Sequence, residues 1–148
     1  MNDHEFRNKI KKSSRKRLNR LAKELNDRVF QDIDCLSCAK CCQGIPPIID
    51  NEDIYRISSA VDLTPDEFEN KHTTIDEDGD RVLISSPCMF LLEDKRCSIY
   101  PLRPKACREY PHLENKFVEH LDYHLVNKSV CPATEKVLNQ IDEALGWL

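Results

Sequence analysis

The sequence predicts a small α+β protein, mostly helical with short hairpins. Apolar residues recur at helical spacing near both ends of the chain, and a turn-forming Asp78-Gly79 pair separates two short extended runs. Four cysteines fall within eight residues: Cys35, Cys38, Cys41 and Cys42. Thiolates are soft ligands, and two cysteines separated by two residues can turn back onto one metal. We therefore expect the fold to be organised around a cysteine-ligated metal centre.

The N-terminal stretch is strongly basic. Residues 1–30 carry ten basic and four acidic side chains, a balance of +6, whereas the rest of the 148-residue chain carries −10. The spacing of Ile10, Leu18 and Leu25 predicts one amphipathic helix over residues 5–30. We therefore divide the chain into a basic N-terminal helix, 1–30, and a cysteine-cluster metal-binding domain, 31–148.

The basic face of this helix has two interpretations. Charged runs on helices are usually solvent faces, and the acidic remainder of the chain would attract this one. A protein partner could also bind there, whereas a nucleic-acid partner is disfavoured because only Phe6 and Phe30 could stack on bases.

The middle of the chain contains clear helix and turn signals. Asp50 or Asn51 can cap a helix over 52–61, and Thr64-Pro65 starts a second helix that should end near Lys71. The remaining predicted elements are a hairpin of 73–75 with 81–84, a second hairpin of 89–92 with 96–100, a short helix over 105–109 and a C-terminal helix over 133–148. Residues 114–126 are ambiguous.

Four further cysteines lie far along the chain: Cys88, Cys97, Cys107 and Cys131. Eight cysteines can mean disulfides or metal ligands. The N-terminus has no apolar signal region, and no stretch approaches the length of a membrane span. These features predict a cytoplasmic protein with reduced, metal-bound thiols and no membrane span.

The order of these cysteines resembles that of a known family. The chain has C-x2-C-x2-C-C at the start, Cys97-Ser-Ile-Tyr followed by Arg103-Pro104, and a late Cys131-Pro132. The stretch from Cys97 to Pro111 is long enough to be specific. This pattern resembles the YkgJ-type cysteine-cluster family, also called the CxxCxxCC zinc- or iron-chelating domain, over about residues 35–132. One departure is Pro87, which precedes Cys88 where the family more often places a proline after it.

The resemblance implies metal chelation, as zinc or as an iron–sulfur cluster, with [4Fe–4S] the expected form if the metal is iron. The metal ligands it implies are Cys35, Cys38, Cys41, Cys42, Cys88, Cys97, Cys107 and Cys131. Two alternatives stay open: an iron–sulfur oxidoreductase or electron carrier, and a zinc-folded interaction module. No catalytic residue can be named from the sequence.

Spacing also suggests how the thiols are divided. Neighbouring side chains usually point apart, so we expect Cys42 to face away from Cys41. It would then join Cys88, Cys97 and Cys107 at a second centre, or be spare if only one centre exists. The first centre would then hold Cys35, Cys38 and Cys41 with Cys131, because a remote Cys-Pro completes such runs in ferredoxins.

Two groups of residues near the cysteines have alternative roles. Arg103 and Arg108 flank Cys107 and could offset the negative charge of a thiolate-bound metal, or pair with surface acids. His120 and His124 are four residues apart, a spacing that suits a metal pair on a helix, but we expect both to be structural or exposed.

Overall fold

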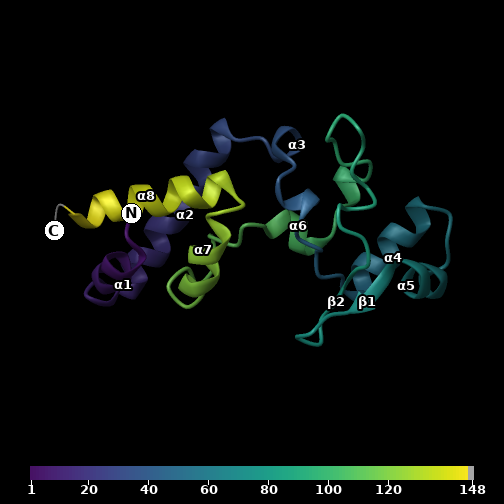
Figure 1. The fold of residues 1–148 in the computed structure, drawn as a ribbon, viewed down its shortest axis with the longest axis horizontal. Coiled ribbons are helices and arrows are strands. Elements are labelled where there is room, and N and C mark those ends of the chain that lie inside the picture. Colours follow the sequence, from purple (N-terminus) through teal and green to yellow (C-terminus); the bar gives the residue numbers. More distant parts are fainter. Residues whose placement is uncertain (147–148) are drawn as a thin grey trace. The chain divides into compact units, whose positions relative to one another are not determined.

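The computed structural model describes residues 1–146, which form two compact units (Figure 1). Unit 1 comprises Met1–Asp34 together with the chain from Pro111 onward, and unit 2 comprises Cys35–Tyr110. The chain after Pro111 is therefore grouped with the N-terminal helices, whereas the sequence-based division placed it with the cysteine cluster. Seven of the eight cysteines lie in unit 2, and Cys131 lies in unit 1.

Unit 1 contains four helices: α1 (Asp3–Lys11), α2 (Arg15–Asp32), α7 (Leu121–Asn127) and α8 (Pro132–Gly146). The C-terminal helix is confirmed as far as the described residues extend, and Leu148 of its predicted apolar face lies outside them. The ambiguous stretch 114–126 contributes most of α7. Helices α2 and α8 pack along each other (Figure 1), and both bury apolar side chains, among them Leu18, Val29, Val137 and Ile141.

The prediction of one continuous helix over 5–30 is wrong, because the chain breaks after α1. Ser14 adopts an extended conformation, and its hydroxyl accepts a hydrogen bond from the amide of Arg17. A serine at this position offers the backbone a cap in place of another helical turn, which starts a new helix. The apolar periodicity continues across the break, so the spacing alone could not reveal it.

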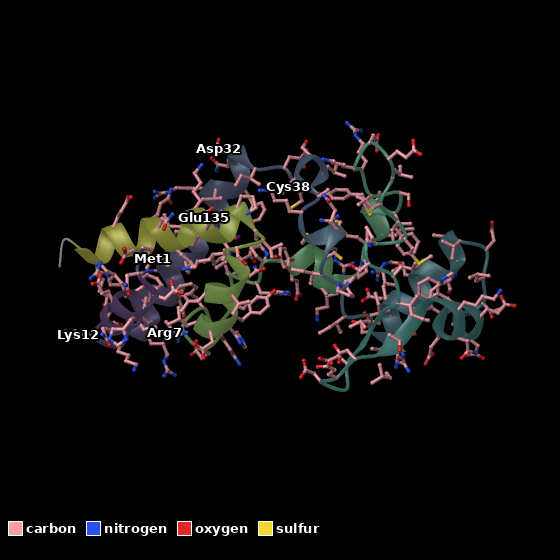
Figure 2. The ribbon with its side chains drawn as sticks, in the orientation of Figure 1. Met1, Arg7, Lys12, Asp32, Cys38 and Glu135 are labelled. Atoms are coloured by element: carbon pink, nitrogen blue, oxygen red, sulfur yellow. The ribbon has the colours of Figure 1, made fainter. Side chains whose placement is uncertain are left out.

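Acidic residues of unit 1 pair with much of its basic face. Arg7 pairs with Asp122, Lys9 lies 2.7 Å from Asp142, and Arg15 lies 3.4 Å from Glu119. Lys12 follows α1 and extends outward from the helices (Figure 2). These pairs are largely exposed and each contributes little, but together they show that the basic helices pack against the acidic C-terminal part of the chain.

Unit 2 begins with the cysteine loop, in which α3 (Cys35–Cys38) and a 3₁₀ turn, η1 (Cys41–Gln43), follow each other. The two predicted helices are confirmed as α4 (Asn51–Ala60) and α5 (Pro65–His72). Asp50 and Thr64 each form a capping box at the helix start, as the sequence signals indicate.

The first predicted hairpin is confirmed. Strand β1 (Thr73–Ile75) pairs antiparallel with β2 (Arg81–Leu83), with Thr73 opposite Leu83. Gly79 turns the chain with φ of 84°, a left-handed conformation that glycine adopts without strain.

The second hairpin, by contrast, is reduced to a single bridge between Leu91 and Cys97. The strands cannot extend because the chain after Cys97 turns at once into the 3₁₀ helix η2 (Tyr100–Leu102). The short helix predicted over 105–109 is confirmed as α6 (Lys105–Glu109).

The core of unit 2 is an apolar cluster of Ile49, Ile54, Ile57, Phe68, Leu83, Phe90 and Ile99. It joins α4, α5 and β2 to the loop that carries two of the distal cysteines. Cys88 and Cys97 are partly buried and pack directly against this cluster. The apolar core therefore fixes the positions of these two cysteines in unit 2.

Candidate metal centre

The cysteine loop reverses direction between its two pairs of thiols. Ala39 has φ of 51° and is 2% exposed, so a non-glycine residue adopts the left-handed conformation in a buried position. This conformation is disfavoured for residues with a Cβ atom and is maintained only where the surroundings determine it. Ala39 thus lies between Cys35 and Cys38 on α3 and Cys41 and Cys42 on η1.

Cys41 and Cys42 lie side by side, contrary to the expectation that adjacent thiols point apart. A hydrogen bond joins the two sulfur atoms and is the largest effect on both groups: it raises the pKa of Cys41 and lowers the pKa of Cys42 to about 6. Both residues lie in the 3₁₀ turn η1.

Cys42 is also linked to the distal cysteines of unit 2. The amide of Cys88 donates a hydrogen bond of 2.8 Å to the carbonyl of Cys42, so the cysteine loop and the 86–92 loop are joined at the backbone. The bridge between Leu91 and Cys97 then continues the connection to the next thiol. The peptide bond before Pro87 is cis.

The thiols of Cys42, Cys88, Cys97 and Cys107 act on one another electrostatically, and we call them the four-thiol set. Burial, together with negative charge on the other three members, raises the pKa of Cys107 to about 12. Burial also raises the pKa of Cys88 and of Cys97, with the charge of Cys42 adding to both shifts. Four clustered thiols that resist joint deprotonation are the groups whose charge a bound cation would compensate.

Arg103 is the cation that opposes these shifts. Its guanidinium group lies 4.0 Å from the centre of the Tyr100 ring and donates a 2.8 Å hydrogen bond to the Tyr100 carbonyl. Its positive charge lowers the pKa values of Cys97 and Cys107, against the larger effect of burial. Arg108 instead donates to the carbonyl of Arg103. Of the two arginines that flank Cys107, Arg103 is therefore the one that acts on the thiols.

The expectation that the fold is built around a formed metal centre is not borne out by the side-chain positions. Within residues 1–146, no group of three or more His, Cys, Asp or Glu side chains is close enough to hold a metal ion. The thiols of the four-thiol set influence one another but do not converge on one point. All eight cysteines lie within the described residues, and they are thiols rather than disulfides. Cys35 is exposed, Cys131 is buried, and the others are half-buried.

The two histidines considered from the sequence have separate environments. His120 is exposed at the start of α7, whereas His124 is fully buried and stacks on Phe117 at 5.2 Å. Neither ring nitrogen of His124 has a hydrogen-bond partner among the described residues. These surroundings support the structural role that we expected for His124.

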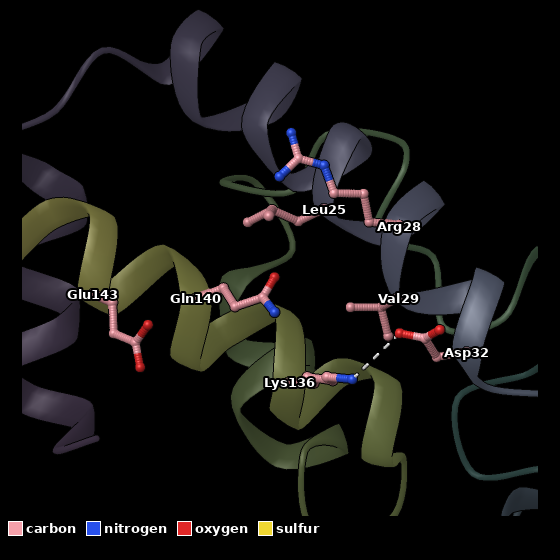
Figure 3. A pocket seen from close by; sticks show the side chains of 7 residues that line it. All are labelled: Leu25, Arg28, Val29, Asp32, Lys136, Gln140 and Glu143. Atoms are coloured by element: carbon pink, nitrogen blue, oxygen red, sulfur yellow. Dashed lines mark ion pairs between the residues drawn. The ribbon is translucent and has the colours of Figure 1, made fainter.

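A shallow hollow of about 490 Å³ lies between α2 and α8 of unit 1 (Figure 3). At one end Lys136 lies 3.9 Å from Asp32. The lining residues are Leu25, Arg28, Val29, Asp32, Lys136, Gln140 and Glu143. This lining contains no cysteine or histidine, so the hollow provides none of the candidate metal ligands.

Sequence reasoning missed one pair of residues in unit 2. Asp53 is 1% exposed, and its carboxylate receives a 2.7 Å hydrogen bond from Arg56. At this helix start the sequence predicted only a cap, at Asp50 or Asn51. The available signal was an arginine three residues after an acid on an otherwise apolar helix face.

The family comparison agrees with the chemistry of these thiols. The chain belongs to the family described as "CxxCxxCC: Putative zinc- or iron-chelating domain", whose model matches residues 34–132. The matched region includes all eight cysteines. No solved structure matches the chain significantly. No helix within residues 1–146 is long and apolar enough to cross a membrane.

Proposed function

We propose that this protein binds zinc or an iron–sulfur cluster through cysteine thiolates, in the reducing environment of the cytoplasm. The core ligands are the four-thiol set: Cys42, Cys88, Cys97 and Cys107. The observation that carries the proposal is geometric: the amide of Cys88 donates a 2.8 Å hydrogen bond to the carbonyl of Cys42, and Cys88 and Cys97 both pack against the apolar cluster of unit 2. Four thiolates are a ligand set suited to structural zinc and to iron–sulfur clusters.

The donor set fits such a metal because it is partly prepared for ionisation. Thiols must deprotonate to bind a metal, and the hydrogen bond from Cys41 favours the ionised form of Cys42 by lowering its pKa. Arg103 supplies positive charge beside Cys97 and Cys107, which offsets part of the negative charge that four thiolates bring to a divalent ion. To bind one metal, the half-buried thiols must rotate toward one another. The apolar cluster meanwhile holds the backbone that carries Cys88 and Cys97 in place.

The other cysteines are proposed as additional ligands. The pKa of Cys41 is raised chiefly by its hydrogen bond to Cys42, with smaller contributions from Cys107 and Cys35, so Cys41 lies within reach of both the cysteine loop and the four-thiol set. Cys38 completes the C-x2-C-x2-C-C run, and Cys131 supplies the late Cys-Pro of the matched region. We expect Cys35, Cys38 and Cys41 of the cysteine loop to serve a second metal, while Cys131 of unit 1 is proposed as a ligand from the family pattern alone.

Single Cys→Ser variants with metal counted per chain test this assignment. Cys97→Ser should lose the metal held by the four-thiol set, because serine is a poor ligand for soft metals. Replacing Ser98, the next residue along the chain, with alanine provides a matched control that leaves all thiols in place. Full metal content in Cys97→Ser would exclude the four-thiol set as the metal centre.

An iron–sulfur oxidoreductase or electron carrier is the alternative within the same ligand chemistry. The half-exposed state of six of the cysteines favours it, since electron transfer needs a cluster near the surface. Reversible bleaching of visible absorption by dithionite in the purified protein would support this alternative. A colourless zinc protein would instead support metal binding for folding, including a zinc-folded interaction module.

A further inference from the structure

Asp53 joins helix α4 to the segment that carries Cys107. Its Oδ1 atom accepts a 3.1 Å hydrogen bond from the amide of Lys105, which is the first residue of α6. Its Oδ2 atom accepts another from the amide of Asp50, within the capping box of α4. One buried carboxylate thus caps two helices that are about fifty residues apart in sequence.

Arg56 strengthens the same connection. Its guanidinium group donates to Asp53 at 2.7 Å, to the carbonyl of Leu102 at 3.4 Å and to the carbonyl of Arg103 at 3.0 Å. The backbone from residue 102 to residue 105 is therefore held at three points by two side chains of α4. We call these two side chains, Asp53 and Arg56, the α4 clamp.

Helix α6 depends on an external cap. It has only five residues, its N-cap is Pro104, which provides no side-chain hydrogen bond, and its first turn has no acid. A helix this short does not form on its own, because nucleation costs more than a few hydrogen bonds return. The carboxylate of Asp53 supplies both the missing cap and the missing negative charge at this helix start.

The segment held by the clamp carries two groups of the candidate metal centre. Cys107 is the third residue of α6, and Arg103 lies within the clamped backbone. We propose that the α4 clamp is the positioning device of the metal centre, fixing Cys107 and Arg103 relative to Cys97 before metal binds. This inference rests on the proposed function, and it assigns Asp53 and Arg56 a role in metal affinity beyond that of core packing.

Cobalt(II) titration of the purified full-length chain, with a competing chelator, tests the proposal. Asp53→Asn should weaken cobalt binding by about ten- to a hundred-fold, the usual effect of losing a residue that orients a ligand. It should also lower the thiolate-to-cobalt charge-transfer absorption at saturation, because Cys107 is no longer held in place. A purely structural role would lower the melting temperature but leave the saturated spectrum unchanged.

Glu52→Gln is the matched control. Glu52 is the exposed neighbour in the same first turn of α4, and the variant removes the same charge. It should bind cobalt within about two-fold of the wild type, since an exposed charge one position away has little effect on the site. A folded Asp53→Asn protein with wild-type affinity and spectrum would overturn the clamp while leaving the proposed function intact.

Arg56→Gln decides the question if Asp53→Asn fails to fold. This variant removes the contacts to residues 102 and 103 but leaves Asp53 to cap Lys105. It should weaken cobalt binding and lower the charge-transfer absorption at saturation, each by less than Asp53→Asn does. Wild-type affinity and a wild-type spectrum would overturn the proposal. A wild-type chain that binds no cobalt and contains neither zinc nor iron as purified would refute the proposed function itself, and the clamp with it.

Discussion

Replacing His124 with phenylalanine should reduce the loss of folding stability that the protein suffers as the pH is lowered. His124 is 0% exposed, stacks on Phe117 with an interplanar angle of 9°, and has no partner for either ring nitrogen among the described residues. Burial, with smaller contributions from the nearby His120 and His112, lowers its pKa from the ordinary 6.5 to about 4. The folded state therefore holds the imidazole neutral, and the unfolded state takes up the proton more readily.

The sign and size of the effect follow from this difference. Between pH 6.5 and pH 4 the unfolded chain binds more protons than the folded one, so stability falls as the pH is lowered through this window. From pH 7 to pH 5 the loss from His124 alone amounts to about 2 kcal/mol. Phenylalanine keeps the ring stack and has no group to protonate.

Urea unfolding at pH 7 and pH 5, followed by helical circular dichroism, measures the effect. The wild type should lose about 2 kcal/mol more than His124→Phe over this range. Loss of metal on acidification affects both proteins and cancels in the comparison. His4→Gln, which removes an exposed histidine of α1, should behave as the wild type. Equal losses in the wild type and His124→Phe would refute the reasoning.

Three further outcomes are expected. Arg103→Gln should weaken zinc binding about ten-fold in a chelator competition, whereas Arg108→Gln, with the same charge change, should have a smaller effect; equal effects would contradict the role of Arg103. Phe68→Ala should lower the free energy of unfolding by about 3–5 kcal/mol in urea, because the ring is fully buried in the apolar cluster. Ser14→Ala should cost about 1 kcal/mol by loss of the α2 cap, and an unchanged midpoint would show that the cap contributes nothing.

Local signals in the sequence predicted the elements that local chemistry decides. The capping boxes at Asp50 and Thr64 and the Asp78-Gly79 turn each specify structure within a few residues, so helices α4 and α5 and the first hairpin were predicted correctly. The break at Ser14 was missed because the apolar spacing continued across it. There the competition between a serine cap and one more helical turn decided the outcome.

The candidate site depends on contacts between distant segments, which spacing cannot give. The resemblance to the family singled out all eight cysteines as candidate ligands. The contact between Cys41 and Cys42, however, lies in a 3₁₀ turn that the sequence did not predict. The clamp was missed for a related reason. The role of Asp53 depends on the amide of Lys105, a partner revealed only when the chain folds.

The most direct test of the account is the metal content of the anaerobically purified chain, measured by elemental analysis together with its visible spectrum. The account predicts at least one zinc ion, or about four irons with broad visible absorption, per chain. It also predicts eight thiols after denaturation without oxidant. A metal-free protein whose denatured mass shows cystines would contradict the central claim that these cysteines are metal ligands.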